Sequence, residues 1–171
     1  ASLILEDLPQ GFELFDDLSF TLEDVETQFA VKWGLVAGQR NTFSRPEGLS
    51  AAVMAGEVAF YRSVGGAAMA VDEGEDMLRS HLVVQKEGES VTIVEIAVIP
   101  VGEHAKAFQI DLVDTAGGKW RMYSILFRRQ NIVGTVDIVS PLSSTPALEE
   151  IRGVATALDS RIAAELTLSS A

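Results

Sequence analysis

Strand-length blocks of β-branched and aromatic residues follow one another from Val91 to Val139. Short clusters of turn-forming residues separate these blocks, a pattern typical of antiparallel strands joined by tight turns. The pattern predicts a meander with strands at 83–86, 91–99, 106–114, 119–129 and 132–139. Apolar residues occupy both alternating faces of the fourth block, so we expect that strand to be central and covered on each face.

Upstream of the meander the pattern predicts two more strands and two short helices. Residues 35–45 read as a strand, and small apolar residues alternate along 49–62 as they do in a strand packed on both faces. Thr21, with an acid three residues later, favours a helix that it caps and that ends near Ala30. Apolar residues at helical spacing predict another helix over 67–82.

The C-terminal part of the chain carries the clearest helical pattern, over 146–167. Apolar residues recur every three or four positions from Leu148 to Leu166, behind a proline that suits the first turn. Such a stripe needs a partner, so we expect this helix to lie on the sheet. The predicted fold class is α+β: one domain, 1–171, with a curved antiparallel sheet of about six or seven strands, this helix, and one or two shorter helices.

Composition and charge argue against some classes of binding partner. The chain has 171 residues, of which 47% are hydrophobic and 22% charged, so it is long and apolar enough to bury a core. Its formal net charge is −12, and Lys and Arg are scattered, which argues against nucleic acid and anionic membranes as partners. The segment 1–26 is acidic and has no Lys or Arg. We interpret its acids as a solvated face, or alternatively as a surface for a cation or a basic partner.

Cysteine is absent, which excludes disulfides, thiolate metal sites and thiol nucleophiles. The longest apolar runs are too short to span a membrane. The chain begins with Ala, so we expect either a trimmed form or a mature form whose leader was removed; membrane tethering through such a leader stays open.

Catalytic and cofactor signals are weak. His81 and His104 lie far apart, and neither has a second histidine or a cysteine at metal-ligand spacing. No G-x-S-x-G motif occurs, and the Gly117-Gly118-Lys119 run lacks the remaining residues of a phosphate loop. We therefore expect no catalytic residues, no metal and no cofactor, and the chain is not predicted to be an enzyme.

The most notable polar group is a set of arginines on the predicted strand 119–129. One interpretation is structural: the arginines pair with acids such as Asp111, Asp114 or Asp137. The other is a site for an anionic ligand or a partner, with aromatic side chains as its apolar walls. The residues of this candidate site are Arg121, Arg128, Arg129, Trp120 and Tyr123.

Several stretches occur together in a recognisable order. They are the L-P-x-G-F opening at 8–12, the segment 51–60 before a short acidic helix, the stretch 101–108, the hairpin 126–133 and the close of the last helix at 158–162. This arrangement resembles the secreted or lipid-anchored sensor-like domains of actinobacteria and related bacteria. It is similar to the extracellular sensor domain of some receptor kinases.

The resemblance implies a curved antiparallel sheet with helices, in an exported protein that a leader or an N-terminal lipid often tethers to the membrane. Such domains bind ligands or partners and are not known as a class for catalysis. This chain departs from the pattern in two places: paired cysteines of some relatives are absent, and Gln130 stands where the hairpin usually turns on glycine. No binding residue is therefore carried over.

Two functions follow as hypotheses. The first is a non-catalytic binding or accessory domain, extracellular or in the cell envelope, that engages a protein partner or a larger envelope assembly. The alternative is a carrier of a small apolar or anionic ligand, with a pocket between the sheet and the C-terminal helix. An enzyme of unrecognised type is a third interpretation. A cytoplasmic location and assembly into a homo-oligomer stay open.

Overall fold

The computed structural model describes residues 1–25, 27–47, 50–82, 89–98, 100–144 and 148–168, and for Glu47 and His81 it describes the backbone alone. The strands are β1 (Glu13–Thr21), β2 (Leu35–Glu47), β3 (Ser50–Tyr61), β4 (Ser90–Ile96), β5 (His104–Val113), β6 (Lys119–Arg129) and β7 (Ile132–Pro141). The helices are α1 (Gln28–Trp33), α2 (Val64–Asp72), α3 (Gly74–Leu82) and α4 (Leu148–Leu168), with short 3₁₀ turns at Leu5–Asp7 and Leu142–Ser144.

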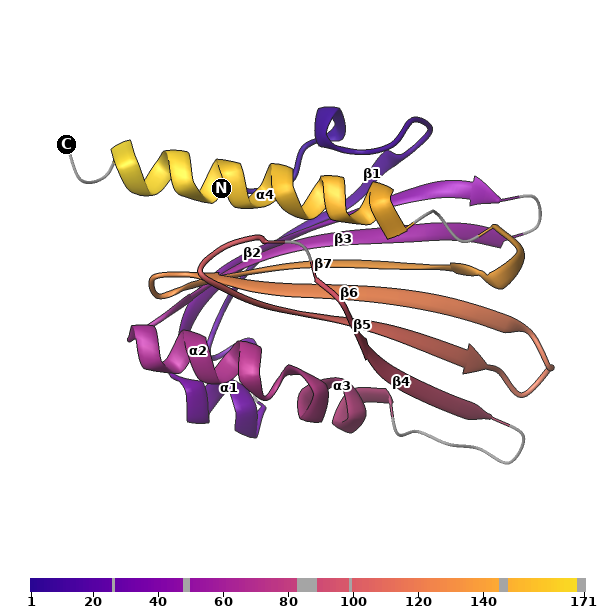
Figure 1. Ribbon diagram of the computed structural model, residues 1–171, viewed down its shortest axis with the longest axis horizontal. Helices are drawn as coiled ribbons and strands as arrows, with labels where there is room; N and C mark the ends of the chain where they lie inside the picture. The colour runs from indigo at the N-terminus through magenta and orange to yellow at the C-terminus, as the bar shows by residue number, and fades with distance from the viewer. Residues whose placement is uncertain (26, 48–49, 83–88, 99, 145–147, 169–171) are drawn as a thin grey trace.

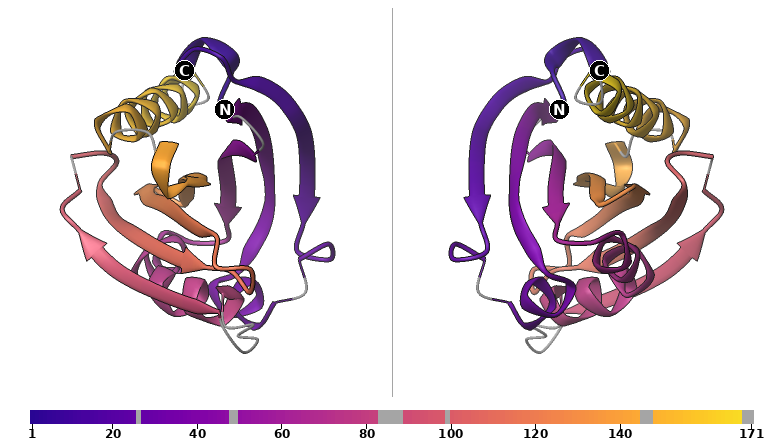
Figure 2. Two further views of the ribbon diagram at one scale, coloured as in Figure 1. Left: turned by 90° about the vertical axis from the view of Figure 1, so that its right-hand side faces the viewer. Right: turned by 90° about the vertical axis from the view of Figure 1, so that its left-hand side faces the viewer.

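All seven strands form one antiparallel sheet in the order β1-β2-β3-β7-β6-β5-β4. Helix α4 covers one face of the sheet, and α1, α2 and α3 lie on the opposite face (Figure 1). The views along the molecule show β1 and β4 at opposite edges of the sheet (Figure 2). This arrangement confirms the predicted α+β class, with a C-terminal helix and shorter helices around an antiparallel sheet.

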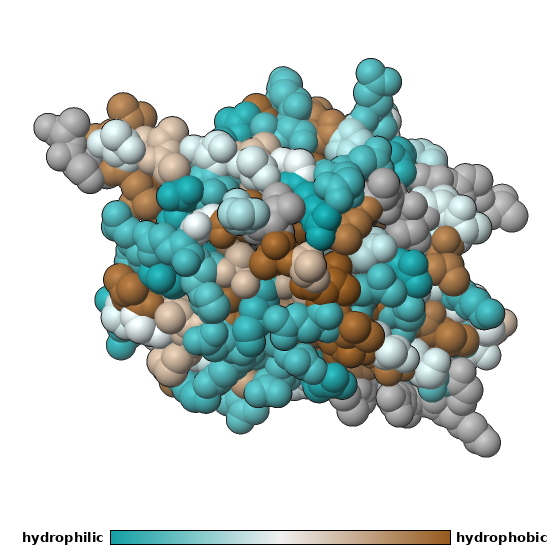
Figure 3. All heavy atoms as spheres, viewed as in Figure 1, coloured by the Kyte–Doolittle hydropathy of each residue, from teal (hydrophilic) through white to brown (hydrophobic). Residues whose placement is uncertain are grey.

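Each face of the sheet has its own apolar core, because successive side chains of a strand point to opposite faces. On β6, Phe127 packs in the core under α4, while its neighbour Leu126 packs in the core under α1, α2 and α3. Ile151 and Leu158 of α4 are fully buried against the first core. Burying each such side chain stabilises the fold by about 1.5–3 kcal/mol. On the molecular face turned to the viewer in Figure 3, hydrophilic residues alternate with smaller hydrophobic patches.

The meander agrees with its prediction in every part that the structure describes. Strands β4, β5, β6 and β7 begin and end within a few residues of the predicted blocks, and β6 coincides with 119–129. The predicted strand at 83–86 lies outside the described residues. The β6–β7 turn is closed by Gln130, whose φ of 51° is left-handed. A side chain other than glycine therefore takes the conformation that glycine adopts most readily.

Two helix predictions were wrong in detail. The first helix begins at Gln28, and its cap is Thr27, whose hydroxyl accepts a hydrogen bond from the Ala30 amide at 3.1 Å. Thr21 ends β1 instead, and its amide and hydroxyl donate to Asp24 at 2.7 and 2.9 Å. The competing local turn explains the error, because Thr and Asp serve turns as readily as caps.

The predicted helix over 67–82 is two helices, α2 and α3, that meet at Glu73. A Cβ added to Gly74 would lie 3.0 Å from the Leu126 side chain, so the second helix begins in close contact with the sheet. The last helix matches its predicted range over 148–167 and continues to Leu168; residues 145–147, which include the predicted cap and proline, lie outside the described part.

The N-terminal segment is built into the domain. Asp7 pairs with Arg161 of α4 through Oδ2 at 2.7 Å and Oδ1 at 3.1 Å, and the amino group of Ala1 lies 2.6 Å from the Glu165 carboxylate. Residues 13–21 then form the edge strand β1. None of the helices in the described part of the chain is long and apolar enough to cross a membrane.

Candidate functional site

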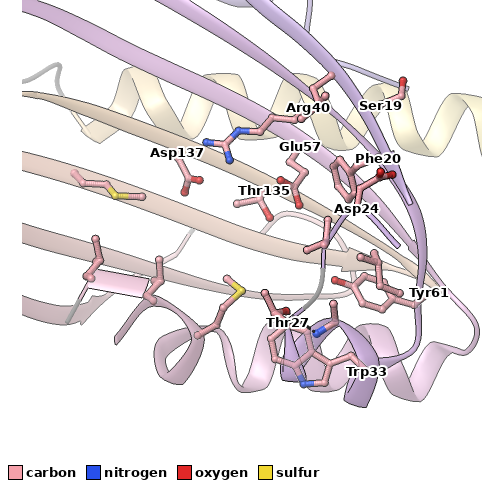
Figure 4. A pocket seen from close by; sticks show the side chains of 18 residues that line it. Ser19, Phe20, Asp24, Thr27, Trp33, Arg40, Glu57, Tyr61, Thr135 and Asp137 are labelled. Atoms are coloured by element: carbon pink, nitrogen blue, oxygen red, sulfur yellow. Dashed lines mark hydrogen bonds between the residues drawn. The ribbon is translucent and has the colours of Figure 1, made fainter. Parts of the chain in front are cut away.

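A pocket of about 530 Å³ lies between the sheet and the helices α1 and α3 (Figure 4). We call it the main pocket. Its size falls within the range of small-molecule sites in proteins. Its lining comprises Leu18, Ser19, Phe20, Asp24, Val25, Thr27, Ala30, Trp33, Leu35, Arg40, Glu57, Tyr61, Met77, Leu78, Leu82, Met122, Thr135 and Asp137.

The wall opposite the sheet is apolar. Helix α1 contributes Trp33, and α3 contributes Met77, Leu78 and Leu82. The Trp33 indole donates to the Glu73 carboxylate at 3.1 Å, so that the aromatic ring is fixed between the helices. These helical side chains would face the apolar part of a bound molecule.

Helix α1 is short, and its two ends fix its position. Thr27 caps its first turn, and Gly34 ends it with a left-handed φ of 74°. Lys32 on its outer side bonds to both oxygens of Glu73 at 2.7 Å. A six-residue helix would not persist alone, so these contacts and the burial of Trp33 hold this wall of the pocket in place.

The sheet supplies a polar floor. Arg40 on β2 lies opposite Glu57 on β3, and Glu57 lies opposite Thr135 on β7. Asp137 comes two residues after Thr135 and therefore points to the same face. Figure 4 shows both carboxyl groups on neighbouring strands, with the Arg40 side chain reaching toward Asp137. Three strands thus bring two acids and one base to one side of the pocket.

The two carboxyl groups of the floor resist ionisation. Burial, followed by the charge of Asp137, raises the pKa of Glu57 to about 7, although Arg40 acts in the opposite direction. Burial also raises the pKa of Asp137, while Ser124 and Arg40 lower it in part. Tyr61, near Glu57, has a raised pKa for the same reasons, burial and the charge of Glu57. Near pH 7 Glu57 therefore still holds its proton part of the time, whereas a solvent-exposed glutamate would have released it.

Two polar atoms near this floor lack partners. Asp137 Oδ1 and Ser124 Oγ are buried, and neither has a well-formed hydrogen bond to any residue that the structure describes, although Ser124 lies close enough to lower the pKa of Asp137. Ser124 is 1% exposed and lies opposite Asp137 in the β6–β7 pairing, so it faces the same side of the sheet. An unsatisfied buried polar atom costs about 1–3 kcal/mol. This part of the floor is therefore suited to receive a polar group from outside the chain.

The five predicted site residues do not gather at the main pocket. Arg121 pairs with Asp111, from Nε at 2.6 Å and Nη2 at 3.0 Å, as the structural interpretation expected. The Trp120 indole donates to Asp114 at 3.2 Å in the β5–β6 turn. Tyr123 is buried in the core under α4.

The other two arginines lie at the far end of β6. Arg128 Nη1 is 2.8 Å from Glu103 and donates to the Gln130 carbonyl at 3.0 Å. Arg129 pairs with Asp159 of α4, with one contact at 2.9 Å. Arg121 is seven residues away along the extended strand, about 23 Å. A ligand or partner role for these arginines and for Trp120 and Tyr123 stays a prediction.

Asp137 was expected among the arginine partners, but in the described part of the chain the three arginines pair with other acids, and Asp137 lies on the pocket floor. The carrier hypothesis placed its pocket beneath the C-terminal helix, and the main pocket lies on the opposite face. A smaller, more open hollow of about 380 Å³ does border α4, near Arg129, Gln130 and Leu166. Its polar rim and shallow shape make it a poorer place for an apolar ligand.

The two histidines have ordinary surroundings where the structure describes them. His104 is the first residue of β5, and its Nε2 lies 2.7 Å from the Asp72 carboxylate. His81 lies in α3, and its side chain is outside the described part. Within the described residues, no three His, Asp or Glu side chains are grouped as metal ligands.

Sequence reasoning missed Arg40, Glu57 and Asp137. A signal existed for the acids: Glu57 is the one charged residue of the small, apolar strand β3, and Asp137 is the one charged residue of β7. A lone acid in a buried strand is rare, because its charge must be paired or neutralised. Arg40 offered no such signal, since it lies in a polar stretch of β2.

Comparison with known proteins gives one finding about the fold. No protein-family model matches the sequence, and no curated protein matches it. Among solved structures, the extracellular domain of PknH from Mycobacterium tuberculosis is similar, with a TM-score of 0.60 and 11% identity over 89% of this chain and 86% of that chain. At this identity the likeness concerns the fold alone. It agrees with the resemblance to extracellular sensor domains that the sequence suggested.

Proposed function

We propose that this chain is a non-catalytic, exported binding domain that holds a small, largely apolar ligand in the main pocket. The observation that carries the proposal is the pocket itself, a hollow of about 530 Å³ with apolar helices on one side and a polar floor on the other. Sites of this size and lining are typical of small-molecule binding. The fold shared with an extracellular domain supports an exported location.

A pocket-filling substitution tests this proposal. Thr135 stands on the floor in the central strand β7, so Thr135→Phe would place an aromatic ring inside the cavity. Thr156→Phe, on the exposed side of α4, is the matched control. The probe is the neutral apolar dye Nile red, whose fluorescence rises in apolar surroundings.

We expect wild type and Thr156→Phe to bind the dye saturably at one site and Thr135→Phe to lose this binding. Circular dichroism of the three proteins checks that the fold is retained. Absence of saturable binding in wild type, or equal binding by folded Thr135→Phe, would contradict the proposal.

The edge strand β1 favours a second candidate function, the binding of a protein partner. Eight of its nine residues are exposed, and Leu14, Phe15 and Leu18 are 53%, 75% and 52% exposed. An open edge strand offers unpaired backbone groups to another extended segment. The acids Glu13 and Asp16 stand beside these apolar residues, so we propose an extended, basic segment of a partner protein as the occupant.

The partner proposal has its own test. A labelled peptide of alternating lysine and valine is titrated against wild type, Phe15→Ser and the control Leu142→Ser, which removes another exposed side chain just after β7, a strand separated from β1 by β2 and β3. We expect salt-sensitive binding that Phe15→Ser weakens at least fivefold and Leu142→Ser leaves unchanged. Equal affinity for all three proteins, or no binding by wild type, would contradict it.

A further inference from the structure

We propose that the ligand of the main pocket is a cationic amphiphile, in which an apolar body carries a protonated amine. The inference rests on the proposed function, because it names the chemical class of the molecule held in that pocket. The amine would lie on the floor between the carboxyl groups of Glu57 and Asp137. The apolar body would lie against Trp33, Leu78 and Leu82.

The charges of the pocket are unbalanced. The groups that face Glu57 are Arg40 from β2, Tyr61 from its own strand and Asp137 from β7, with Asp24 in the lining after β1. The lining residues of α1 and α3 carry no charge. Asp24 is held ionised, since the amide and then the hydroxyl of Thr21 lower its pKa by hydrogen bonding. Three acidic groups therefore face one base, and a cation from outside would offset the negative charge that appears when Glu57 and Asp137 ionise.

The buried acceptor on the floor favours a ligand that carries a hydrogen-bond donor. Asp137 Oδ1 is a buried acceptor without a well-formed hydrogen bond among the described residues, and the nearby Ser124 hydroxyl only partly favours its ionised form. An ammonium group has three donors and no acceptor, like the lysine side chain. It could donate to Asp137 Oδ1 and to the carboxyl of Glu57 on the neighbouring strand. A carboxylate would instead meet acceptors of its own sign.

Arg40 does not reverse this preference. Its side chain is exposed although it reaches toward Asp137 (Figure 4), and it forms no ion pair with Glu57 or Asp137, all three of which the structure describes. In this position it remains solvated and only partly compensates the two acids. An anionic head that approached Arg40 would also lie near the carboxyl groups of Glu57 and Asp137, which would repel it when ionised.

Binding of a cation on the floor should be coupled to release of the Glu57 proton. Glu57 holds its proton up to about neutral pH, and an ammonium favours the ionised carboxyl. An alkylammonium has a pKa near that of lysine, about 10.4, and so stays charged when Glu57 titrates. Its binding should therefore be roughly tenfold tighter at about pH 8 than at about pH 6.

The test uses four probes with one tail: dodecylamine, dodecanol, dodecanoate and dodecyl-trimethylammonium, each below its micelle concentration and each displacing Nile red. For wild type at about pH 7.5 we expect dodecylamine to bind at least tenfold tighter than dodecanol, and dodecanoate more weakly than dodecanol. The trimethylammonium probe keeps the charge and lacks N–H donors, so an intermediate affinity is expected if both charge and hydrogen bonds matter.

Glu57→Gln and Asp137→Asn are the variants. Each should lower the preference for amine over alcohol about tenfold and leave dodecanol affinity unchanged, and Glu57→Gln should also flatten the pH dependence. If either variant fails to fold, the other and the wild-type probe series still decide. Binding of dodecanol equal to or tighter than dodecylamine, or a preference for dodecanoate, would overturn the inference while leaving the proposed function intact. Failure of every probe, dodecanol included, would overturn both.

Discussion

Arg40 on β2 lies directly opposite Glu57 on β3, yet these two described residues form no ion pair. The guanidinium reaches along the pocket toward Asp137, which shares the floor with Glu57 (Figure 4). Without a close partner, burial dominates, and Glu57 keeps its proton to a pH near 7. The stability of the protein should therefore respond to pH through this residue.

The first prediction concerns that response. The pKa of Glu57 is raised from 4.5 to about 7, so the folded state binds a proton that the unfolded state has released. The stabilisation is present in full below pH 4.5 and is lost as pH rises to about 7, by at most about 3 kcal/mol. Glu57→Gln should remove this loss, so its urea-unfolding free energy should exceed that of wild type at pH above 7.

The control for this prediction is Glu149→Gln, which changes an exposed acid at the start of α4. It should alter the unfolding free energy by no more than about 0.5 kcal/mol at any of these pH values. Parallel curves for wild type and Glu57→Gln between about pH 5 and 8 would show that Glu57 titrates normally.

A second prediction separates two ion pairs of β6. Asp159 is 7% exposed and receives bonds from Arg129 and from the Gly102 amide at 3.0 Å. Burial alone would raise the pKa of Asp159, and these bonds more than reverse that, so its pKa is lowered. Asp159→Ala leaves Arg129 unpaired against α4 and should cost about 2–4 kcal/mol in urea unfolding.

The matched variant is Asp111→Ala, which breaks the more exposed pair with Arg121 and should cost at most about 1 kcal/mol. The two variants also address the arginines that the sequence singled out. Equal losses would mean that Arg129 does not depend on its buried partner, and this would favour a ligand or partner role for the Arg128-Arg129 end of the strand.

Much of the fold follows from local sequence patterns. The block 119–129 predicts β6 to the residue, since alternation of apolar side chains depends only on neighbours in the chain. The pairing of β3 with β7 is different, because it brings together Glu57 and Thr135, which lie far apart in the sequence. No local pattern encodes that contact. The main pocket was missed for this reason: its floor exists only once β3 and β7 are side by side.

Local competition accounts for the errors in the helices. Thr21 and Thr27 are both suitable caps, and the sequence alone does not decide between them. Thr21 is the last residue of β1, where it pairs with Ala37 of β2. Its hydrogen bond to Asp24 then closes a turn after the strand, so Thr21 does not cap a helix. The position of α1, and so one wall of the pocket, therefore depends on strand pairing.

The last prediction tests how closely α1 must approach α2. A Cβ added to Gly66 of α2 would lie 2.0 Å from the Trp33 carbonyl oxygen of α1, closer than any real contact. Gly66→Ala must push the helices apart, at a cost of about 1–3 kcal/mol, and should weaken Nile red binding because Trp33 lines the pocket. Gly153→Ala in α4 is the control, since no heavy atom lies within 4 Å of its added Cβ. That change should stabilise the helix by about 0.5–1 kcal/mol. Urea unfolding and dye titration of both variants measure the difference, and a stable Gly66→Ala protein with unchanged dye affinity would show that α1 does not shape the pocket.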